Sequence, residues 1–384
     1  MFLFFAALII AIACSAITIK TLVGYSDLKL FYKIPAAILI VLGWFAPLIM
    51  WLLSPTNILS GGIYMIVSHL LYSLMGFVFI LFIAIMLRDV IWYIVYGIAK
   101  MTGRSGWHIH PKNLSLLGKA NCLVVLFSIA ISVYALYQGY KQPEVRELTF
   151  YSDKITGDMT IAQISDLHIN RATPLLRIQQ LVNDINMLNP DVIVLTGDTI
   201  DDNVVLIEEH LKALKELSAP FGVYSIMGNH EFYNDIYASK RVLNDHNLTF
   251  LFNGGLHINN TNVFIAGIPD LGTMYERVNL WRTLGKSKKK DYKILLSHTP
   301  NIIDSLSSGL VDLVLSGHTH GGQIFPFHLF VKQANRYLAG QYRVNGTDLY
   351  VSRGAGTWGP AMRLLAPADI ALIHLKKKNK QPAS

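Results

Sequence analysis

The chain has 384 residues, of which 52% are hydrophobic and 15% are charged. This composition is too apolar for an entirely soluble protein and is typical of a globular domain joined to a lipid-embedded one. The two cysteines, Cys14 and Cys122, lie in apolar segments, so a disulfide scaffold and a cysteine-based metal site are excluded. The net charge of +8 includes lysine runs at 286–290 and 376–380. Such runs either attract anionic head groups of a bilayer or form a solvated face and a disordered tail; we expect no nucleic-acid partner.

The first part of the chain predicts a transmembrane helical domain over residues 1–141. It holds four uncharged stretches, each near or above the ~20 residues that a helix needs to cross a bilayer. The first stretch has no basic residues before it, so we interpret it as a retained helix and not as a signal peptide. The segment Val90–Ala99 is apolar but too short to cross alone, so it either extends the third helix or lies along the interface. The expected spans are 1–19, 34–53, 61–87 and 120–140.

Basic residues in the loops predict an orientation. Under the positive-inside rule the first and third loops are cytoplasmic, because they carry the lysines and arginines and the loop 54–60 carries none. Four spans then place the carboxy-terminal part outside, whereas a fifth crossing near Val90 would reverse this. The loop residues are Lys20, Lys29 and Lys33, then Arg88, Lys100, Arg104, Lys112 and Lys119.

After a connector at 142–158, residues 159–376 predict a globular domain, and 377–384 form a basic tail. Short β-type runs alternate with helix-type runs there, which favours an α/β sandwich. Helices are expected at Leu175–Leu188 and Val204–Leu217. Strands are expected at Met159–Ile164, Asp191–Leu195, Phe221–Met227, Val263–Gly267, Lys293–Leu296, Leu313–Leu315 and Asp348–Val351.

Polar residues of metal-ligand type repeatedly follow these strands. Loops at strand ends are where α/β folds place their sites. Carboxylate, amide oxygen and imidazole together suit Mn²⁺, Fe or Zn²⁺. Each element alone has an ordinary structural explanation, such as a turn after a strand, but the ordered series indicates a metal site. Its members are Asp166, His168, Asp198, Asn229, His230, His298, His318 and His320.

These residues stand in a pattern that resembles the calcineurin-like metallophosphoesterases. The family pattern is Asp-x-His, Gly-Asp-x-x-Asp, Gly-Asn-His-Glu/Asp, a lone His and Gly-His-x-His. The match covers roughly residues 161–375 and implies a four-layer α/β/β/α fold. Its parts are Asp166/His168, Gly197–Asp201, Gly228–Glu231, His298 and Gly317–His320.

The resemblance implies two divalent metal ions that activate a water for attack on phosphorus, with Mn²⁺ favoured and Fe or Zn²⁺ as alternatives. It implies that His230 stabilises the transition state or protonates the leaving oxygen, and that Asp201 orients its imidazole. Asp202 is expected to be a solvated loop residue. The implied ligands are Asp166, His168 and His320 for the first ion, Asn229, His298 and His318 for the second, and Asp198 as the bridge.

Within the family the chain resembles a membrane-associated bacterial branch. Gly317–Gln323 and Tyr350–Gly359 carry this likeness, whereas Asp202-Asn203 replaces the Arg-Gly of protein phosphatases and Asp201 replaces the tyrosine of purple acid phosphatases. Some members of the branch cleave UDP-2,3-diacylglucosamine during lipid A synthesis. The resemblance therefore implies an integral protein of the bacterial cytoplasmic membrane.

The prediction of the substrate-binding region depends on an apolar run, 324–330, directly after the last metal motif. It either lines an acyl-chain groove, dips into the bilayer interface or packs as core. Phe325, Phe327 and Arg353 are the predicted substrate contacts, and Arg353 has a structural ion pair as its alternative. The leading hypothesis is an amphiphilic pyrophosphate substrate. The alternatives are an extracytoplasmic phosphodiesterase acting on envelope lipids or cell-wall phosphodiesters, and a non-catalytic membrane sensor or binding module.

Overall fold

The computed structural model describes residues 2–26, 28–54, 58–104, 106–111, 113–233, 235–245, 248–272 and 277–378. Contacts divide the chain into two compact units. One comprises Met1–Tyr137 with Gly359–Met362, and the other comprises Gln138–Trp358 with Arg363–Ser384. Most of the basic tail predicted at 377–384 lies outside the described residues.

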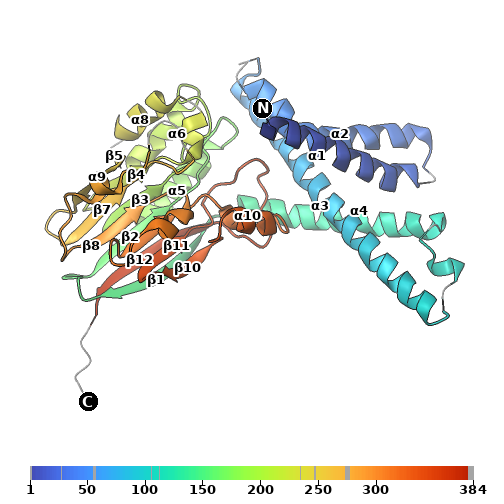
Figure 1. Cartoon of the computed structure of the whole chain (residues 1–384). Coiled ribbons are helices and arrows are strands. Elements are labelled where there is room, and N and C mark those ends of the chain that lie inside the picture. Colours follow the sequence, from blue (N-terminus) through green and yellow to red (C-terminus); the bar gives the residue numbers. More distant parts are fainter. Residues whose placement is uncertain are drawn as a thin grey trace. The chain divides into compact units, whose positions relative to one another are not determined.

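The first unit is built of helices (Figure 1), four of which are long and apolar enough to cross a membrane. The third predicted span is part of one unbroken helix that also contains Val90–Ala99, so this segment extends the helix. At 41 residues it is about 60 Å long, twice the thickness of the hydrocarbon. The helices are α1 (Phe2–Ile19), continued by a π-helical turn at Lys20–Gly24, then α2 (Leu30–Leu53), α3 (Gly61–Met101) and α4 (Leu114–Tyr140).

Polar side chains connect the helices of this unit. Arg88 of α3 pairs with its neighbour Asp89 at 2.6 Å and donates to the amide oxygen of Asn121 on α4. The amide nitrogen of Asn121 donates to the carbonyl oxygen of Thr21 at 3.1 Å. These contacts satisfy a charged group that is largely buried among apolar helices.

The second unit contains two six-stranded sheets. The first has the order β1-β12-β2-β3-β4-β5 and the second the order β10-β11-β9-β8-β7-β6. Strands β2 to β5 are parallel, as are β7, β8, β9 and β11. The strands are β1 (Glu144–Ser152), β2 (Met159–Ile164), β3 (Val192–Thr196), β4 (Val223–Ile226), β5 (Leu248–Phe250), β6 (Gly254–His257), β7 (Val263–Gly267), β8 (Tyr292–Leu296), β9 (Leu313–Ser316), β10 (Gly340–Val344), β11 (Thr347–Val351) and β12 (Asp369–Lys377).

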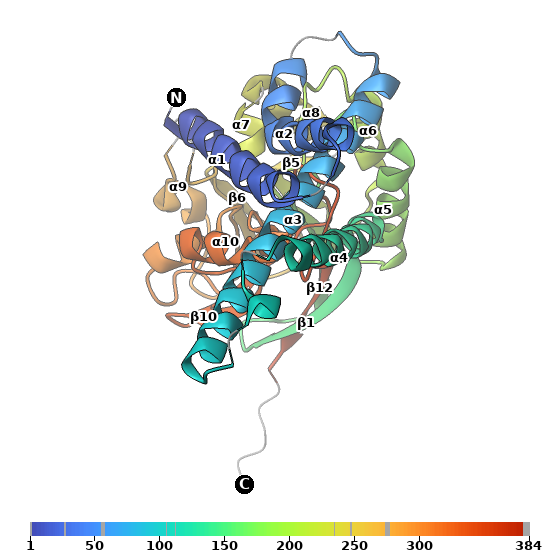
Figure 2. The same ribbon diagram turned by 90° about the vertical axis from the view of Figure 1, so that its right-hand side faces the viewer.

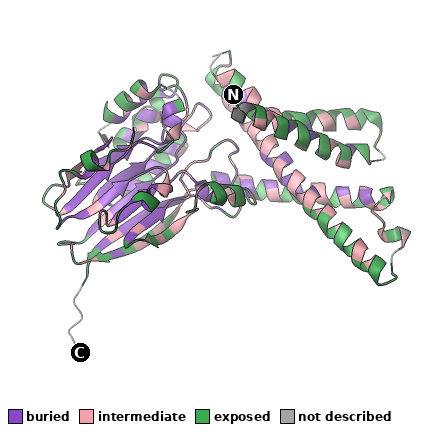
Figure 3. Cartoon of the chain, in the orientation of Figure 1, coloured by how far each residue is buried: buried purple, intermediate pink, exposed green. Residues whose placement is uncertain are grey.

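Three apolar cores separate four layers, and the strands are mostly buried (Figure 3). The core between the sheets takes alternate residues of each, such as Ile161 and Val194 of the first and Ile294 of the second. The helices α5 (Leu175–Met187) and α6 (Glu208–Lys212) contribute to the core on the outer face of the first sheet. Leu284 of α9 (Leu280–Leu284) lies in the core on the outer face of the second sheet. The predicted α/β/β/α architecture is confirmed.

Two sequence expectations differ from the structure. The connector predicted at 142–158 contains β1, which pairs with β12 in parallel along its whole length and lies beside it at the sheet edge (Figure 2). Its residues alternate between more covered and exposed positions, because an edge strand is only half covered. The helix predicted at Val204–Leu217 is shorter, since α6 begins at Glu208 and continues as a 3₁₀ turn at Ala213–Glu216.

The remaining short helices lie in the loops between strands. They are α7 (Asn229–Tyr233), α8 (Ile236–Asp245), α10 (His328–Ala334) and 3₁₀ turns at Pro300–Ser305 and His320–Gly322, whereas a 3₁₀ turn at Trp107–Ile109 lies between α3 and α4 of the first unit. Because β2, β3, β4, β8, β9 and β11 all end on the same side, their following loops meet there. We call this side of the sandwich the site edge.

Candidate metal centre

The predicted ligands occupy strained backbone positions at the site edge. Asp166, His168, Asp198, His318 and His320 have φ angles between 48° and 72°. Residues with a Cβ pay roughly 1–2 kcal/mol each for this left-handed conformation, and such strain concentrates at functional sites. Hydrogen bonds between loops hold the conformation: the N–H of Asp166 donates to the carbonyl of Gly197, and that of His168 to the carbonyl of Asp198.

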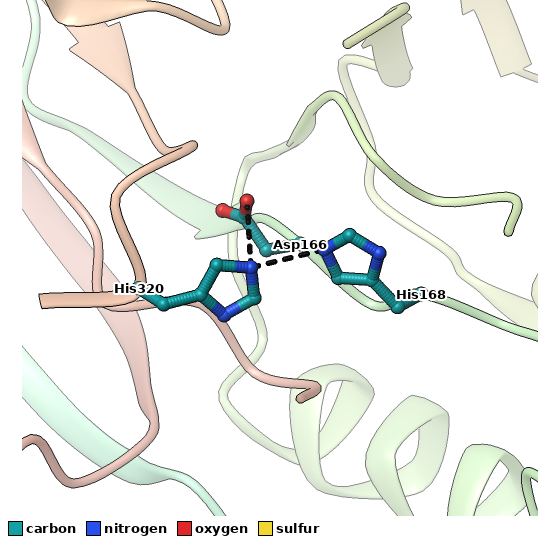
Figure 4. A group of neighbouring side chains, drawn as sticks. All are labelled: Asp166, His168 and His320. Carbon is teal, nitrogen blue, oxygen red and sulfur yellow. Dashed lines mark hydrogen bonds and ion pairs between the residues drawn. The ribbon is translucent and has the colours of Figure 1, made fainter. Parts of the chain in front are cut away.

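Asp166, His168 and His320 form a first group of potential ligands (Figure 4). The Nε2 atoms of the two imidazoles lie 3.0 Å apart, and Nε2 of His320 lies 3.5 Å from Oδ1 of Asp166. Burial and the neighbouring His168 lower the pKa of His320 well below its ordinary value. The neutral ring keeps a lone pair for a metal ion, as a histidine ligand requires.

Asp198, His298 and His318 form a second group. Nε2 of His298 lies 3.0 Å from Oδ2 of Asp198 and 3.3 Å from Nδ1 of His318. Burial opposes ionisation of Asp198, but the adjacent His298 outweighs it and lowers the pKa of this carboxyl. The same Oδ2 atom lies 3.7 Å from Nε2 of His168, so Asp198 stands between the two groups.

Asn229 adds an amide oxygen. Its Oδ1 atom is buried and has no hydrogen-bond partner among the described residues, whereas its Nδ2 donates to the hydroxyl of Tyr233 at 3.2 Å. A buried acceptor without a donor is costly unless another group occupies its lone pairs, and a divalent cation does so. Together with the two groups of carboxylates and imidazoles, this oxygen fits a centre for divalent metal ions.

His230 and Asp201 form a pair beside the ligands. Nδ1 of His230 lies 2.5 Å from Oδ1 of Asp201, and its Nε2 atom lies 4.0 Å from Oδ2 of Asp198. Burial lowers the pKa of His230, but the hydrogen bond to Asp201 outweighs it and raises the pKa to about 9. Burial likewise raises the pKa of Asp201, yet hydrogen bonds from His168 and His230 lower it to about 2. The hydrogen bond to Asp201 therefore favours the charged form of the His230 imidazole.

Two glycines permit the ligand loops to approach closely. A Cβ atom at Gly317 would lie 1.9 Å from the hydroxyl of Ser165 and 2.3 Å from Oδ2 of Asp166. A Cβ atom at Gly228 would lie 2.2 Å from Oδ1 of Asp198. Any larger residue would displace a carboxylate ligand, which explains why glycine precedes both the Asn-His and the His-x-His motifs.

Glu231 has a role that the motif did not predict. Its fully buried carboxylate accepts four backbone hydrogen bonds. Oε2 accepts from the N–H groups of Asp198 and Gly228 at 3.1 and 2.8 Å, and Oε1 accepts from those of Thr199 and Ile200 at 2.6 and 2.9 Å. It therefore holds the loop that carries Asp198.

Arg363 was also missed, because it stands outside every motif in the sequence. Its fully buried guanidinium donates to the carbonyls of Arg353, Gly354 and Ala366 at 2.9 Å each. Gly354 in turn packs so tightly against Asp166 that a Cβ atom would lie 2.7 Å from it. Arg363 thus fixes a loop that packs against the first group of ligands.

The predicted substrate residues lie around this centre in different environments. Arg353 is held 3.5 Å from the buried carboxylate of Asp369, in agreement with the structural alternative. Phe325 and Phe327 are exposed, which excludes packing as core, whereas Ile324 is buried. The expectation for Asp202 was wrong: it is buried and accepts from Arg171 at 2.8 Å, because the loop after β3 folds inward.

Gln323 and Trp358 form a further contact beside the centre. The amide of Gln323 donates to the carbonyl of Trp358 at 2.9 Å and accepts from its N–H at 3.0 Å. This reciprocal pair places the indole with its ring centre 5.9 Å from that of His230. The exposed Trp358 thus borders the position where a substrate would meet His230.

The chain resembles known proteins over most of its length. Residues 159–322 match the family model described as calcineurin-like phosphoesterase. An uncharacterized metallophosphoesterase of Helicobacter pylori (strain J99) is 36% identical over 68% of this chain and 72% of its own length. A protein of Danio rerio described as a transmembrane protein with metallophosphoesterase domain is 28% identical over 66% of this chain and 62% of its own length. Among solved structures, the NAD nucleotidase of Haemophilus influenzae has a TM-score of 0.37 and 13% identity over 52% of this chain and 45% of its own.

The chain belongs to the calcineurin-like phosphoesterase family. The predicted family membership is confirmed, and the protein is a metal-dependent phosphoester hydrolase. The family and the two groups of ligands imply divalent metal ions. The four apolar helices and the transmembrane relative indicate a membrane protein.

Proposed function

We propose that the protein uses two divalent metal ions, with Mn²⁺ favoured, to hydrolyse a phosphoester or pyrophosphate bond of an amphiphilic substrate. The observation that supports this proposal most directly is that Asp198 falls in two groups of side chains that could hold a metal ion. It lies with His168 and His230 in one group and with His298 and His318 in the other. A carboxylate in this position suits a bridge between two ions. Asp166 and His320 complete the first site, and Asn229 completes the second.

In this proposal the ions, when bound, lower the pKa of water and neutralise charge on the attacking and leaving oxygens. The protein supplies the proton. Asp201 keeps His230 protonated, and the Nε2–H of that ring donates to the leaving oxygen, a contribution typically of about 10²–10⁴ in rate. Trp358 borders this donor, with its ring centre 5.9 Å from that of the imidazole.

UDP-2,3-diacylglucosamine is the first substrate candidate, and the reaction places the protein in lipid A synthesis at the bacterial inner membrane. Two features support it. Gln323 extends the last metal motif in the same way as in the membrane-associated bacterial branch of the family. Its reciprocal hydrogen bonds with Trp358 give this residue a structural role. Phe325 and Phe327 present exposed aromatic surface directly beyond this motif, where acyl chains of a substrate can lie.

An extracytoplasmic phosphodiesterase acting on envelope lipids or cell-wall phosphodiesters is the second candidate. The supporting observation is that Val90–Ala99 continues α3 and does not form a separate crossing. With four spans, the basic loops favour an external position for the catalytic unit. A nucleotide-linked lipid made on the cytoplasmic side would not reach a site in that position.

One experiment separates the candidates. The full chain, solubilised in detergent with Mn²⁺, is offered UDP-2,3-diacylglucosamine and, separately, an aryl phosphodiester, with Asp198→Ala as control. Release of UMP that the variant lacks supports the first candidate. Turnover of the aryl diester alone supports two-metal hydrolysis with another substrate, and turnover of neither by the metal-loaded chain overturns the proposal.

A further inference from the structure

The chain enters its catalytic unit at the site edge. Strand β1 begins at Glu144, whose register partner is Asp369 at the start of β12. Asp369 accepts hydrogen bonds from the side chain of Ser352 and the N–H of Arg353, which directly follow the carboxyl end of β11. The start of β1 therefore lies on the same side of the sandwich as the metal ligands, although β1 itself runs away from them.

The last residues of α4, from Gln138 onward, belong to the catalytic unit. Arg177, in the first turn of α5, donates to the carbonyl oxygens of Gly139 and Tyr140, at 3.0 Å each. A helix leaves its last carbonyls without internal partners, and a guanidinium there both satisfies them and complements the helix dipole. The end of α4 is thus held at a defined position of the catalytic unit.

The length of α4 brings the site edge close to a bilayer. Its 27 residues are about 40 Å long, roughly 10 Å more than the hydrocarbon thickness, and only Lys141–Pro143 separate it from β1. Three residues reach at most ~11 Å. Where α4 crosses the membrane, the start of β1 therefore lies within or just beyond the head-group layer.

An exposed apolar segment covers the same edge. The chain leaves β9 at Ser316, carries the last metal motif, and returns at Gly340, which pairs with Val351 at the carboxyl end of β11. The intervening α10 has no buried residue (Figure 3). We call four exposed side chains of this segment the apolar rim: Phe325, Phe327, Leu329 and Phe330.

We propose that the apolar rim inserts into the interface of the bilayer that α4 crosses. Aromatic and aliphatic side chains next to an exposed lysine, here Lys332, are typical of interfacial segments that contact anionic lipids. The rim then acts with α4 as a second attachment and turns the metal ligands toward the phosphate layer of the membrane. Substrates whose phosphorus lies at head-group depth reach the site without leaving the bilayer.

Quenching by lipids tests this placement without any need for hydrolysis. The full chain with Cys14→Ala and Cys122→Ala receives Phe330→Cys, is labelled with an NBD fluorophore, and is placed in nanodiscs of phosphatidylethanolamine and phosphatidylglycerol. Tyr151→Cys is the matched control, because Tyr151 is 64% exposed and Phe330 is 65% exposed, and Tyr151 lies near the end of β1, opposite the site edge. Leu329→Cys provides a second rim position.

We expect blue-shifted emission at both rim positions and stronger quenching by phospholipid with a doxyl group at carbon 5 than at carbon 12. The control position remains unquenched. Equal quenching at rim and control positions overturns the proposal. A blue shift that no doxyl lipid quenches also overturns it, because the rim is then covered by protein, such as a second copy of the chain.

A second measurement separates lipid contact from the proposed reaction. The variant Leu329→Ser/Phe330→Ser should lose activity several-fold on a phosphodiester embedded in the nanodisc and keep its activity on a soluble aryl phosphodiester. Equal loss on both substrates contradicts a role of the rim in access from the membrane. This arm rests on the proposed function, whereas the fluorescence arm does not.

Discussion

The carboxylate of Glu231 accepts a hydrogen bond from the backbone N–H of Asp198, the residue that stands between the two groups of potential ligands. Glu231, a side chain of the Gly-Asn-His-Glu motif, therefore acts on the backbone that carries Asp198. Each carboxylate oxygen accepts two N–H groups, so both oxygens are needed as acceptors.

This geometry predicts that Glu231→Gln is nearly as harmful as Glu231→Ala. The amide NH₂ would face two N–H donors, and each unsatisfied buried donor costs about 1–3 kcal/mol. We expect a lower thermal unfolding midpoint and reduced metal content in detergent. Glu209→Gln, which changes an exposed glutamate, should leave both unaffected. Wild-type stability of Glu231→Gln would contradict the role assigned to the four hydrogen bonds.

Asp201→Asn should change the pH dependence of activity. In the wild type the hydrogen bond to Asp201 raises the pKa of His230 to about 9, so the protonated donor is present below that pH and is lost as pH rises through it. A neutral amide stabilises the imidazolium less, so the alkaline limb of kcat should move to lower pH. We also expect activity at neutral pH to fall about 10–100-fold. An unmoved limb with metal-saturated enzyme would show that His230 does not supply the proton.

Metal content should depend on which ligand is removed. Asp198→Ala removes the carboxylate that stands between the two groups, so it should lose both ions after dialysis. His320→Ala removes a ligand of the first group alone and should keep the ion at His298 and His318. Inductively coupled plasma mass spectrometry of the purified chains measures this. Equal retention in the two variants would argue against Asp198 as a bridge.

Gly317→Ala should abolish activity with little effect on the rest of the fold. The added methyl group would lie within 2.3 Å of the Asp166 carboxylate and closer still to Ser165, so the first group of ligands must shift. Gly157→Ala is the control, because a methyl group there meets no atom within 4 Å. Activity assays and circular dichroism distinguish the two. An active Gly317→Ala enzyme would mean that the loop adjusts without moving the ligands.

The strands that carry the site were predictable because each is a short run of strand-forming residues that ends at a clear turn signal. β2 was predicted at its exact bounds from Met159 to Ile164, and the loops that follow β2, β3 and β9 place their polar residues together. Parallel strands of one sheet end on one side, so local sequence suffices to predict that the loops after β2 and β3 meet. Strand β9 belongs to the other sheet, and its loop meets them only in the folded sandwich, where the N–H of His318 donates to Asp166. The roles of the ligands as metal-binding residues remain predictions.

The supporting residues were not predictable in the same way. Arg363 lies outside every motif, and its structural role depends on carbonyl groups that surround it only in the folded chain. The strand β1 was interpreted as a connector because it is an edge strand with exposed polar residues, and its pairing with β12 joins segments from opposite ends of the domain. Such contacts leave no periodic signal in either segment.

The pairing of β1 with β12 also sets the order in which the domain is completed during synthesis. β1 is the first strand of the catalytic unit to leave the ribosome, yet its neighbour in the sheet, β12, is the last strand to be made. Contacts that close so long a stretch of chain form slowly, and unpaired strands invite aggregation meanwhile. Strand β1 directly follows α4 in the chain, so α4 can insert into the membrane before β12 is made and the sheet is completed. A chain truncated before Asp369 would remain anchored, but its first strand would lack a partner.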